Sequence, residues 1–413
     1  MTGHHTRLAP EDLYREPNAL APHYSRFRVA ERLLLTGHSH QAWPDCGFAG
    51  QLRAWEDAAR LVDGKWEEAF ARGNRVRAGY AELLGRPGRP DEGDYALGSN
   101  THELVVRFLS ALPLRARPRL VTTAGEFHSI RRQLDRLEEE GPTIVRVPVD
   151  PIDSLSERLR LATDDETAGV LVSAVLYRDA RIVGGLDRVA ERCEEVGCHL
   201  LVDAYHALNA IPFDLSKLGL EGAFVVGGGY KYCQLGEGNC FLRVPPDCGL
   251  RPAVTGWFAE FSALHGAEDE GRVSYGSGAE RFAGSTYDPT SHYRAAEVFD
   301  FFRERGLAPA FLRAVSRHQM DRLARGFDGL DADPELVDRD RETPPDAVGG
   351  FLALRTPRAR DFHEALAARG VATDYRDDLL RLGPAPYLSD RQLDDAVAAL
   401  GEVAAGFQAV SRR

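Results

Sequence analysis

Two hydrophobic patterns alternate along the middle of the chain. Short, almost wholly apolar runs are followed by longer stretches in which apolar residues recur every three or four positions, as on one face of a helix. This alternation of buried strands and amphipathic helices predicts a mostly parallel sheet that is covered by helices on both faces. The predicted strands are 119–123, 143–149, 169–176, 199–203 and 223–226, and the helical stretches between them are 126–140, 153–162 and 184–197.

The flanking regions carry other patterns. Apolar residues at helical spacing over 48–84 predict one amphipathic helix with its tryptophans in the core. Helical patterns dominate 291–327, and 350–400 then alternates strand, helix, strand, strand and helix. The predicted units are an N-terminal segment (1–46) that joins the small domain and the active site, a large domain (47–288) and a small α+β C-terminal domain (289–413).

Charge and composition exclude several partners. The net charge of −12 and the pI near 5.6 argue against nucleic acid and against an anionic membrane surface. No stretch approaches the roughly 20 apolar residues of a membrane-spanning helix, and the polar start of the chain is unlike a signal peptide. We therefore expect a cytoplasmic protein. The six cysteines form no C-x-x-C pair, which favours reduced thiols.

The strongest chemical signal lies where two apolar runs end. The first run, 200–202, is followed by Asp203 and, three residues later, by His206. The second run, 223–226, is followed by the glycines 227–229, two residues before Lys231. We expect the glycines to leave room for a bulky group beside the backbone. A lysine in a dry pocket has a lowered pKa and can form a Schiff base with an aldehyde cofactor. Asp203 could hold a cationic ring nitrogen, so the pair points to pyridoxal 5'-phosphate.

A solvated lysine that simply follows a strand is the alternative interpretation of Lys231. The chain has only three lysines, Lys65, Lys217 and Lys231, among its 51 basic residues. A lysine in this position is therefore less expected as a random surface cation.

A phosphate site is predicted near residue 100. Asn100 and Glu103 resemble a capping box, and the free N–H groups and dipole of a helix N-terminus bind phosphate. An ordinary capped helix is the alternative. The phosphate candidates are Gly98, Asn100, Thr101 and His102.

The motif order resembles a known family. The string D-x-x-H at 203–206, followed by G-Y-K-Y at 229–232 and a G-x-G turn, resembles the class V aminotransferase group of fold type I pyridoxal-phosphate enzymes, and kynureninases within it. The resemblance implies an α/β fold with a mostly parallel seven-stranded sheet in the large domain and a small α+β C-terminal domain. It also implies a homodimer with shared active sites.

The resemblance assigns roles around the cofactor. Lys231 would carry the cofactor and then act as the base, while Asp203 keeps the pyridine nitrogen protonated with support from His206. Phe127 would stack on the ring, with His128 as its substitute. The phosphate would be held by Tyr230, Thr101, His102, Trp257 of a G-W-F string, and Thr286 of the same or the neighbouring subunit.

On the substrate side, Arg381 matches the arginine that grips the α-carboxylate. The segment G-H-S-H-Q stands where kynureninases have G-N-S-L-G, so its residues and a nearby tryptophan are substrate candidates. H-x-H also suggests a metal, but no third ligand is in view, so none is expected. Ile130 stands where kynureninases have an aspartate. The substrate candidates beside Arg381 are His38, Ser39, His40 and Trp43.

Three hypotheses follow. The first is kynureninase-like hydrolysis of the Cβ–Cγ bond of kynurenine or a related amino acid, releasing alanine. The second is other chemistry on this scaffold, such as transamination or β-elimination, which the altered positions Ile130 and 38–40 keep open. The third is a non-catalytic binding protein, which has no need of the Lys231 amine. The acidic, glycine-rich stretch 266–285 is expected to be a mobile loop over the site.

Overall fold

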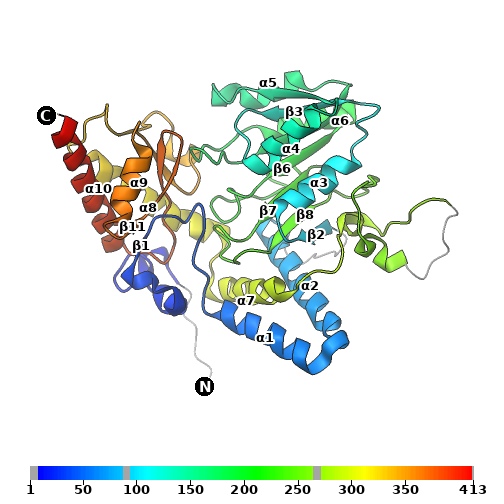
Figure 1. Cartoon of the computed structure of the whole chain (residues 1–413), viewed down its shortest axis with the longest axis horizontal. Coiled ribbons are helices and arrows are strands. Elements are labelled where there is room, and N and C mark those ends of the chain that lie inside the picture. The colour runs from blue at the N-terminus through cyan, green and yellow to red at the C-terminus, as the bar shows by residue number, and fades with distance from the viewer. Residues whose placement is uncertain (1–7, 87–93, 264–270, 412–413) are drawn as a thin grey trace.

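The central feature of the structure, a computed structural model that describes residues 8–86, 94–263 and 271–411, is a seven-stranded sheet (Figure 1). All neighbouring strands run parallel except β8, which is antiparallel to both of its neighbours. The expected α/β architecture is therefore confirmed. In sheet order the strands are β2 (Tyr95–Gly98), β8 (Cys240–Arg243), β7 (Phe224–Gly228), β6 (His199–Asp203), β5 (Thr167–Ser173), β3 (Arg119–Thr123) and β4 (Thr143–Val147).

Helices cover both faces of this sheet. Side chains alternate along a strand, so Val170 and Val172 of β5 join one core cluster while Leu171 joins the other. The first cluster lies beneath α5 and α6, and the second beneath α3 and α4. The covering helices are α3 (Thr101–Ala111), α4 (His128–Glu138), α5 (Leu155–Ala162) and α6 (Leu186–Val196).

The parallel strands bring their carboxyl ends to one edge. Ser173 at the end of β5 pairs with Asp203 at the end of β6, which pairs in turn with Val226 of β7. In open α/β sheets ligands bind at this edge. Asp203 and Lys231, which follow the two apolar runs, are therefore brought to the same edge of the sheet.

The predicted helix over 48–84 is broken. It consists of α1 (Cys46–Leu61), a short 3-10 turn (Val62–Gly64) and α2 (Lys65–Leu83), and Val62 at the break has a φ of 52°. The two helices pack against α7 (Thr290–Arg305). A Cβ on Gly50 of α1 would lie 2.6 Å from the Tyr293 carbonyl oxygen, so the small residues of α1 face α7.

The expectation that the tryptophans lie in the core is wrong for Trp55, which is 76% exposed. Because the glycine face of α1 packs against α7, the apolar stripe that carries Trp55 points outward. Helical periodicity identifies an apolar stripe on a helix, but it does not show which face of that helix packs against the rest of the protein. The exposed stripe consists of Phe48, Leu52 and Trp55.

The C-terminal part contains a separate four-stranded antiparallel sheet. Strand β1 (Leu33–Leu34) pairs with β11 (Val371–Ala372) and so joins the N-terminal segment to this part. The domain boundaries themselves stay a prediction. The sheet order is β12 (Asp374–Arg376), β13 (Leu379–Leu382), β10 (Leu352–Arg355) and β9 (Asp338–Arg339), with helices α8 (Pro309–Asp328), α9 (Ala359–Ala367) and α10 (Asp390–Ser411) around it (Figure 1).

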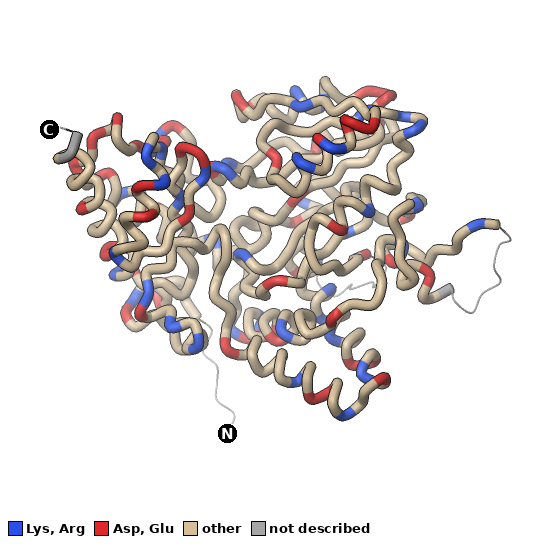
Figure 2. The backbone as a smooth tube through the Cα atoms, in the orientation of Figure 1, with Lys and Arg blue, Asp and Glu red and all other residues tan. Residues whose placement is uncertain are grey.

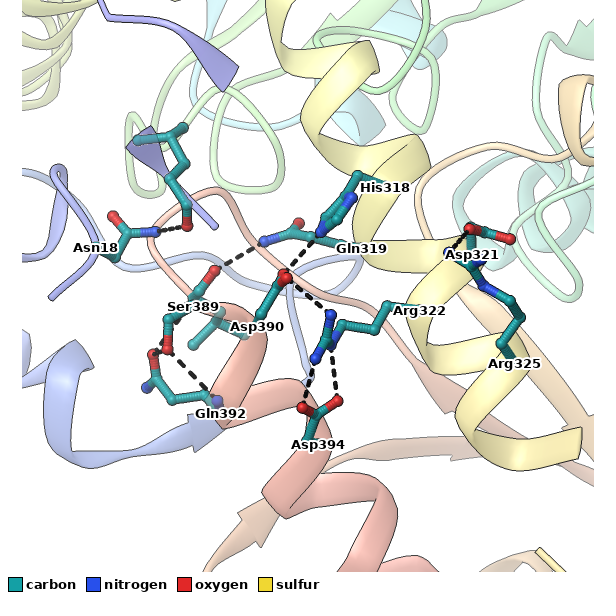
Figure 3. A network of polar contacts seen from close by, with 12 residues as sticks. Asn18, His318, Gln319, Asp321, Arg322, Arg325, Ser389, Asp390, Gln392 and Asp394 are labelled. Atoms are coloured by element: carbon teal, nitrogen blue, oxygen red, sulfur yellow. Dashed lines mark hydrogen bonds and ion pairs between the residues drawn. The ribbon is translucent and has the colours of Figure 1, made fainter. Parts of the chain in front are cut away.

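A polar network ties α8 to α10 (Figure 3). His318 Nε2 and Arg322 Nη1 of α8 lie 2.7 and 2.8 Å from the two carboxylate oxygens of Asp390, and Arg322 also bonds to Asp394. Gln392 and Ser389 cap the start of α10, as expected for a helix start. The network holds the C-terminal helix against the rest of the small domain.

Acidic and basic residues are interspersed along the chain (Figure 2). Within the described ranges, none of the helices combines the length and the apolar character that a membrane span requires. Residues 266–270 of the predicted loop 266–285 lie outside the described residues, and the remainder includes a 3-10 turn at Gly278–Phe282.

Candidate active site

Lys231 lies just beyond the end of β7, and its side chain is buried, with 7% of the residue exposed. Its Nζ is 2.7 Å from Nε2 of His206. Burial lowers the pKa of Lys231 to about 7; the negative charge of Asp203 opposes this shift, and the positive charge of Arg381 adds to it. The amine is therefore partly unprotonated at neutral pH, as a nucleophile requires.

Asp203 and His206 stand beside this amine. Oδ1 of Asp203 accepts the N–H of Tyr205 at 2.8 Å, whereas Oδ2 accepts no hydrogen bond from any described residue. Burial raises the pKa of Asp203, whereas the hydrogen bond from the Tyr205 N–H and the positive charge of Lys231 act to lower it. Burial also lowers the pKa of His206 well below its usual value, so its ring is neutral. The buried Nδ1 of His206 has no partner within the described part of the chain.

Aromatic rings surround the lysine. Its Nζ lies 5.6 Å from the ring centroid of Phe127, 5.1 Å from that of Tyr205 and 5.9 Å from that of Tyr230. Phe127 also meets Tyr177 edge to face. A flat ring placed here would find aromatic surface and little water, because these side chains exclude solvent from the amine.

Bulky side chains lie beside the backbone at the glycine run, as expected. A Cβ on Gly228 would lie 2.5 Å from the Tyr205 hydroxyl, and a Cβ on Gly229 would lie 2.5 Å from Leu235. The space beside these glycines is therefore filled by the protein's own side chains and not reserved for a ligand. Glycine is required here because the strand end is closely packed, which holds Lys231 in position.

The start of α3 is capped as predicted. The N–H of Glu103 donates to Oδ1 of Asn100 at 2.9 Å, and Nδ2 of Asn100 donates to Oε1 of Glu103 at 2.9 Å. The backbone N–H of Thr101 points toward Cys240, whose sulfur is 3.9 Å from the Tyr205 hydroxyl. The helix N-terminus therefore lies near the aromatic rings around Lys231. His102 is exposed, and no described contact joins it to the lysine.

Replacing Asn100 with alanine is expected to lower the free energy of unfolding by about 1 kcal/mol, because α3 loses its N-cap. Urea denaturation of the Asn100→Ala and Asn100→Ser variants measures the effect. The serine variant keeps a capping oxygen and is expected to retain most of the stability. Equal stability of the alanine variant and the wild type would contradict the cap.

The segment 38–43 is split between two surroundings. His40 stacks on Tyr230, with ring centroids 4.6 Å apart, and Oγ of Ser39 is 3.2 Å from Nδ1 of His40. His38 is buried, which lowers its pKa to about 4. Trp43 instead packs against Phe27 and the guanidinium of Arg294, and no described contact joins it to Lys231. The substrate roles of these residues stay predictions.

Arg381 already has partners. Its Nη2 donates to Oδ2 of Asp374 at 2.6 Å, and its Nη1 donates to the carbonyl of Tyr177 at 2.5 Å. The Nε2 of His38 lies 3.6 Å from the same oxygen of Asp374. Although burial acts to raise it, His38 and Arg381 hold the pKa of Asp374 below its usual range. Arg381 is therefore part of an ion pair before any substrate arrives.

Trp257 and Thr286 contact each other. The indole N–H of Trp257 donates to Oγ1 of Thr286 at 3.2 Å, and Trp257 is 44% exposed. Thr286 lines a cavity of about 1000 Å³ that Gly98 and Ser99 also line, whereas Lys231 does not. Within one subunit, therefore, no described contact brings the predicted phosphate residues Trp257 and Thr286 to the lysine.

Sequence reasoning missed Glu126, which is 2% exposed. Its carboxylate accepts hydrogen bonds from the hydroxyls of Thr123 and Ser173, both at 2.6 Å. Burial nevertheless raises its pKa to about 7, and the charge of Asp203 acts in the same direction. Its position beside Phe127 was the available signal. Asp374 was also missed, because only the strand register places it opposite Arg381.

The residues present fit pyridoxal 5'-phosphate. A buried amine with a pKa near neutrality can bind its aldehyde, and the open oxygen of Asp203 can accept from a protonated ring nitrogen. The unpartnered Nδ1 of His206 leaves a polar atom that a bound ring could satisfy. The sheet topology and this cluster at its carboxyl edge define the class of protein as a fold type I enzyme.

Known proteins agree with this class. A family model described as "Kynureninase C-terminal domain" matches residues 313–400. A kynureninase of Burkholderia pseudomallei (strain 1106a) is 29% identical over 423 residues, covering 93% of this chain and 92% of its own. An uncharacterised aminotransferase of Bacillus subtilis (strain 168) is 25% identical over 350 residues, covering 84% of this chain and 88% of its own.

Among solved structures, a C-DES variant with glycine covalently linked to its pyridoxal-phosphate cofactor has a TM-score of 0.79 at 13% identity, covering 92% of this chain and 98% of that one. At this identity the likeness shows the fold alone. The chain is similar to kynureninases and to an aminotransferase, and its fold is that of the fold type I pyridoxal-phosphate enzymes. The resemblance seen in the sequence is confirmed.

Proposed function

We propose that the protein is a pyridoxal-phosphate-dependent enzyme that hydrolyses the Cβ–Cγ bond of kynurenine or a related α-amino acid and releases alanine. The observation that carries this proposal is the buried Lys231 amine, 2.7 Å from neutral His206 and close to the charge of Asp203. The similarity to a kynureninase along 93% of the chain supports the choice of reaction.

Pyridoxal phosphate, when bound, supplies an electron sink for negative charge at the substrate's α-carbon. Asp203 keeps a proton on the ring nitrogen through its open oxygen. Lys231 holds the cofactor and then takes and returns the α-proton at Nζ, with His206 Nε2 as its neighbour. Phe127 and Tyr205 exclude water from the amine and fix the tilt of a flat ring.

The phosphate group has candidate ligands at the start of α3 and in Tyr230. The backbone N–H groups of Thr101 and His102 at this helix start would contact it, and Asn100 keeps the helix start in place. Trp257 and Thr286 bond to each other on an exposed surface, so we assign them to the phosphate of the neighbouring subunit.

This assignment requires a homodimer with shared active sites. The outward stripe of Phe48, Leu52 and Trp55 on α1 offers apolar surface for a second copy. We further propose that the enzyme acts in the cytoplasm. Its partner is a small-molecule substrate, since a net charge of −12 disfavours nucleic acid.

The rate of cofactor attachment is expected to rise with pH through about 7. Only the neutral amine reacts, and the pKa of Lys231 is lowered to about 7, so the reactive fraction falls about tenfold per pH unit below that value and levels off above it. Stopped-flow absorbance of the cofactor-free protein mixed with pyridoxal phosphate measures the rate. A half-maximal rate near pH 10, as for an exposed lysine, would contradict the buried amine.

The reaction is tested by adding L-kynurenine to the reconstituted enzyme and following anthranilate fluorescence and alanine release. Equal amounts of both products are expected. A control with cofactor-free protein should produce neither. If the cofactor absorption changes but no anthranilate forms, hydrolysis of kynurenine is excluded.

A second candidate is transamination or β-elimination on another amino acid. It is favoured by Ile130, which is 1% exposed and packs in the core where kynureninases carry an aspartate. The similarity to an aminotransferase also supports it. Formation of pyridoxamine phosphate, or of a keto acid with ammonia, on incubation with a panel of amino acids would establish this alternative.

A further inference from the structure

A buried chain of hydrogen bonds joins the N-terminal segment to the loop that carries Lys231. The Tyr24 hydroxyl donates to Oε1 of Gln234 at 2.5 Å, and Nε2 of Gln234 donates to Oε1 of Gln41 at 2.7 Å. Nε2 of Gln41 donates in turn to the carbonyl of Gly37 at 3.2 Å. Tyr24 and Gln234 are 0% exposed, and Gln41 is 4% exposed. The Tyr24–Gln234–Gln41 network therefore lies in the protein interior, where an unmade hydrogen bond is costly.

The network holds the backbone on both sides of Lys231. The backbone N–H of Gln41 donates to the carbonyl of Tyr230, the residue before Lys231, at 3.2 Å. The backbone N–H of Gln234 donates to the carbonyl of Lys231 itself at 3.1 Å and so closes the turn 231–234. Because the side chains of the two glutamines are bonded to each other, the two contacts with the loop are linked.

Gln234 adopts an unfavourable backbone conformation in this turn. Its φ is 59°, in the left-handed region that residues with a side chain rarely adopt. Such a conformation costs free energy and persists only where the surrounding structure enforces it. Both ends of the Gln234 amide are bonded, one to Tyr24 and the other to Gln41. The network therefore holds the turn in a conformation that the backbone alone does not favour.

The place of the Lys231 amine depends on this turn, because Lys231 is its first residue. Its Nζ lies 2.7 Å from Nε2 of His206, and 7% of the residue is exposed. A substitution in the network changes what holds the amine in place, and it removes none of the charges around the amine. The charged groups that act on the amine are Asp203, Arg381, Asp374 and Arg376, and none of them belongs to the network.

We infer that Gln234 and Gln41, with Tyr24, are positioning residues for cofactor attachment, because they hold the Lys231 amine in its buried place against His206. In this step Nζ takes the place of the aldehyde oxygen of the cofactor, and the two N–H hydrogens of the neutral amine leave with that oxygen as water. The inference rests on the proposed function, in which Lys231 is the attachment amine. The strand pattern and the motif order assign no role to these three residues.

The test is the pH dependence of cofactor attachment to the Gln234→Ala and Gln234→Asn variants, followed by stopped-flow absorbance after mixing with pyridoxal phosphate. When the turn relaxes, water reaches the amine and its pKa moves toward that of an exposed lysine. The pH of half-maximal rate is expected to rise from about 7 by about one unit, which slows attachment at pH 7 about tenfold. This midpoint does not depend on the fraction of folded protein.

The asparagine variant separates the side chain from the backbone. Asparagine tolerates the left-handed conformation, but it is one methylene too short to bond to both Tyr24 and Gln41. A shift as large as that of the alanine variant is therefore expected, and it would assign the effect to the lost hydrogen bonds.

Tyr24→Phe provides a milder disturbance of the same network. It removes only the hydroxyl that donates to Gln234, and the ring is retained. Burial raises the pKa of Tyr24 well above its usual value, so the wild-type hydroxyl stays a donor throughout the measured pH range. A smaller upward shift of the midpoint is expected.

Gln319→Ala is the matched control. Gln319 is also a buried glutamine, 2% exposed, and its Nε2 donates to the carbonyls of Ala385 and Leu388 at 2.9 and 3.1 Å. No described contact joins it to the turn 231–234. Its removal is expected to lower the stability of the protein and to leave the midpoint near pH 7.

The outcomes that would overturn the inference are distinguishable. An unchanged midpoint in both Gln234 variants and in Tyr24→Phe contradicts the positioning role and leaves the proposed function intact. An equal shift in Gln319→Ala also contradicts it, because the effect would then follow the loss of any buried glutamine. A wild-type protein to which pyridoxal phosphate does not attach contradicts the proposed function itself, and the inference falls with it.

Discussion

Replacing Lys231 with alanine is expected to abolish covalent cofactor attachment and to lower kcat/KM by at least about 10³-fold, because one residue supplies both the attachment amine and the base. The visible absorption of the reconstituted wild type should be missing from the variant. The amine is buried beside His206, and no other lysine shares this environment. Absorption spectroscopy and steady-state kinetics measure the two effects.

Lys217→Ala is the matched control for this variant. The side chain of Lys217 is 83% exposed and pairs with Asp214 at 3.1 Å. Its removal is expected to leave the spectrum and the kinetics unchanged. Thermal unfolding of both variants separates a chemical loss from a folding defect. A Lys231→Ala protein that is folded, coloured and active would refute the role of the amine.

Replacing Asp203 with asparagine is expected to reduce kcat/KM by about 10²- to 10³-fold. An amide cannot stabilise a protonated ring nitrogen, and removing one partner of a buried charge pair costs about 3–5 kcal/mol. The shape of the side chain is kept, and the N–H of Tyr205 can still donate to an amide oxygen. The loss should therefore appear in catalysis more than in stability.

The measurement for Asp203 is kcat/KM together with the dissociation constant of pyridoxal phosphate. Asp214→Asn is the control for the same chemical change, at a partly buried carboxylate that bonds to the backbone of Ser216 and Lys217. An Asp203→Asn enzyme with wild-type kinetics would show that the ring nitrogen does not depend on this carboxylate.

The sequence predicted the parts of the fold that depend on local pattern. Asp203 and Lys231 follow apolar strands, and strand ends of a parallel sheet meet at one edge, so their proximity could be expected. The cap at Asn100 is likewise a local signal, and the structure confirms it. In both cases the residues that allow the prediction lie within a few positions of the strand end or the helix start that they identify.

The features that the sequence did not predict depend on long-range packing. Asp374 and Arg381 are paired by antiparallel strand register, which a hydrophobic pattern does not specify. Trp55 is exposed because the glycines of α1 pack against α7, a helix that is distant in the sequence. The bulky groups beside the glycines before Lys231 are Tyr205 and Leu235, which the local sequence does not identify.

The most direct test of the central claim is to locate the cofactor on the chain. The protein reconstituted with pyridoxal phosphate is reduced with borohydride and digested, and the pyridoxyl group is assigned by mass spectrometry. With only three lysines, at 65, 217 and 231, the assignment is unambiguous. We predict a pyridoxyl group on Lys231 alone. Modification of Lys65 or Lys217 instead, or of no lysine, would contradict the account.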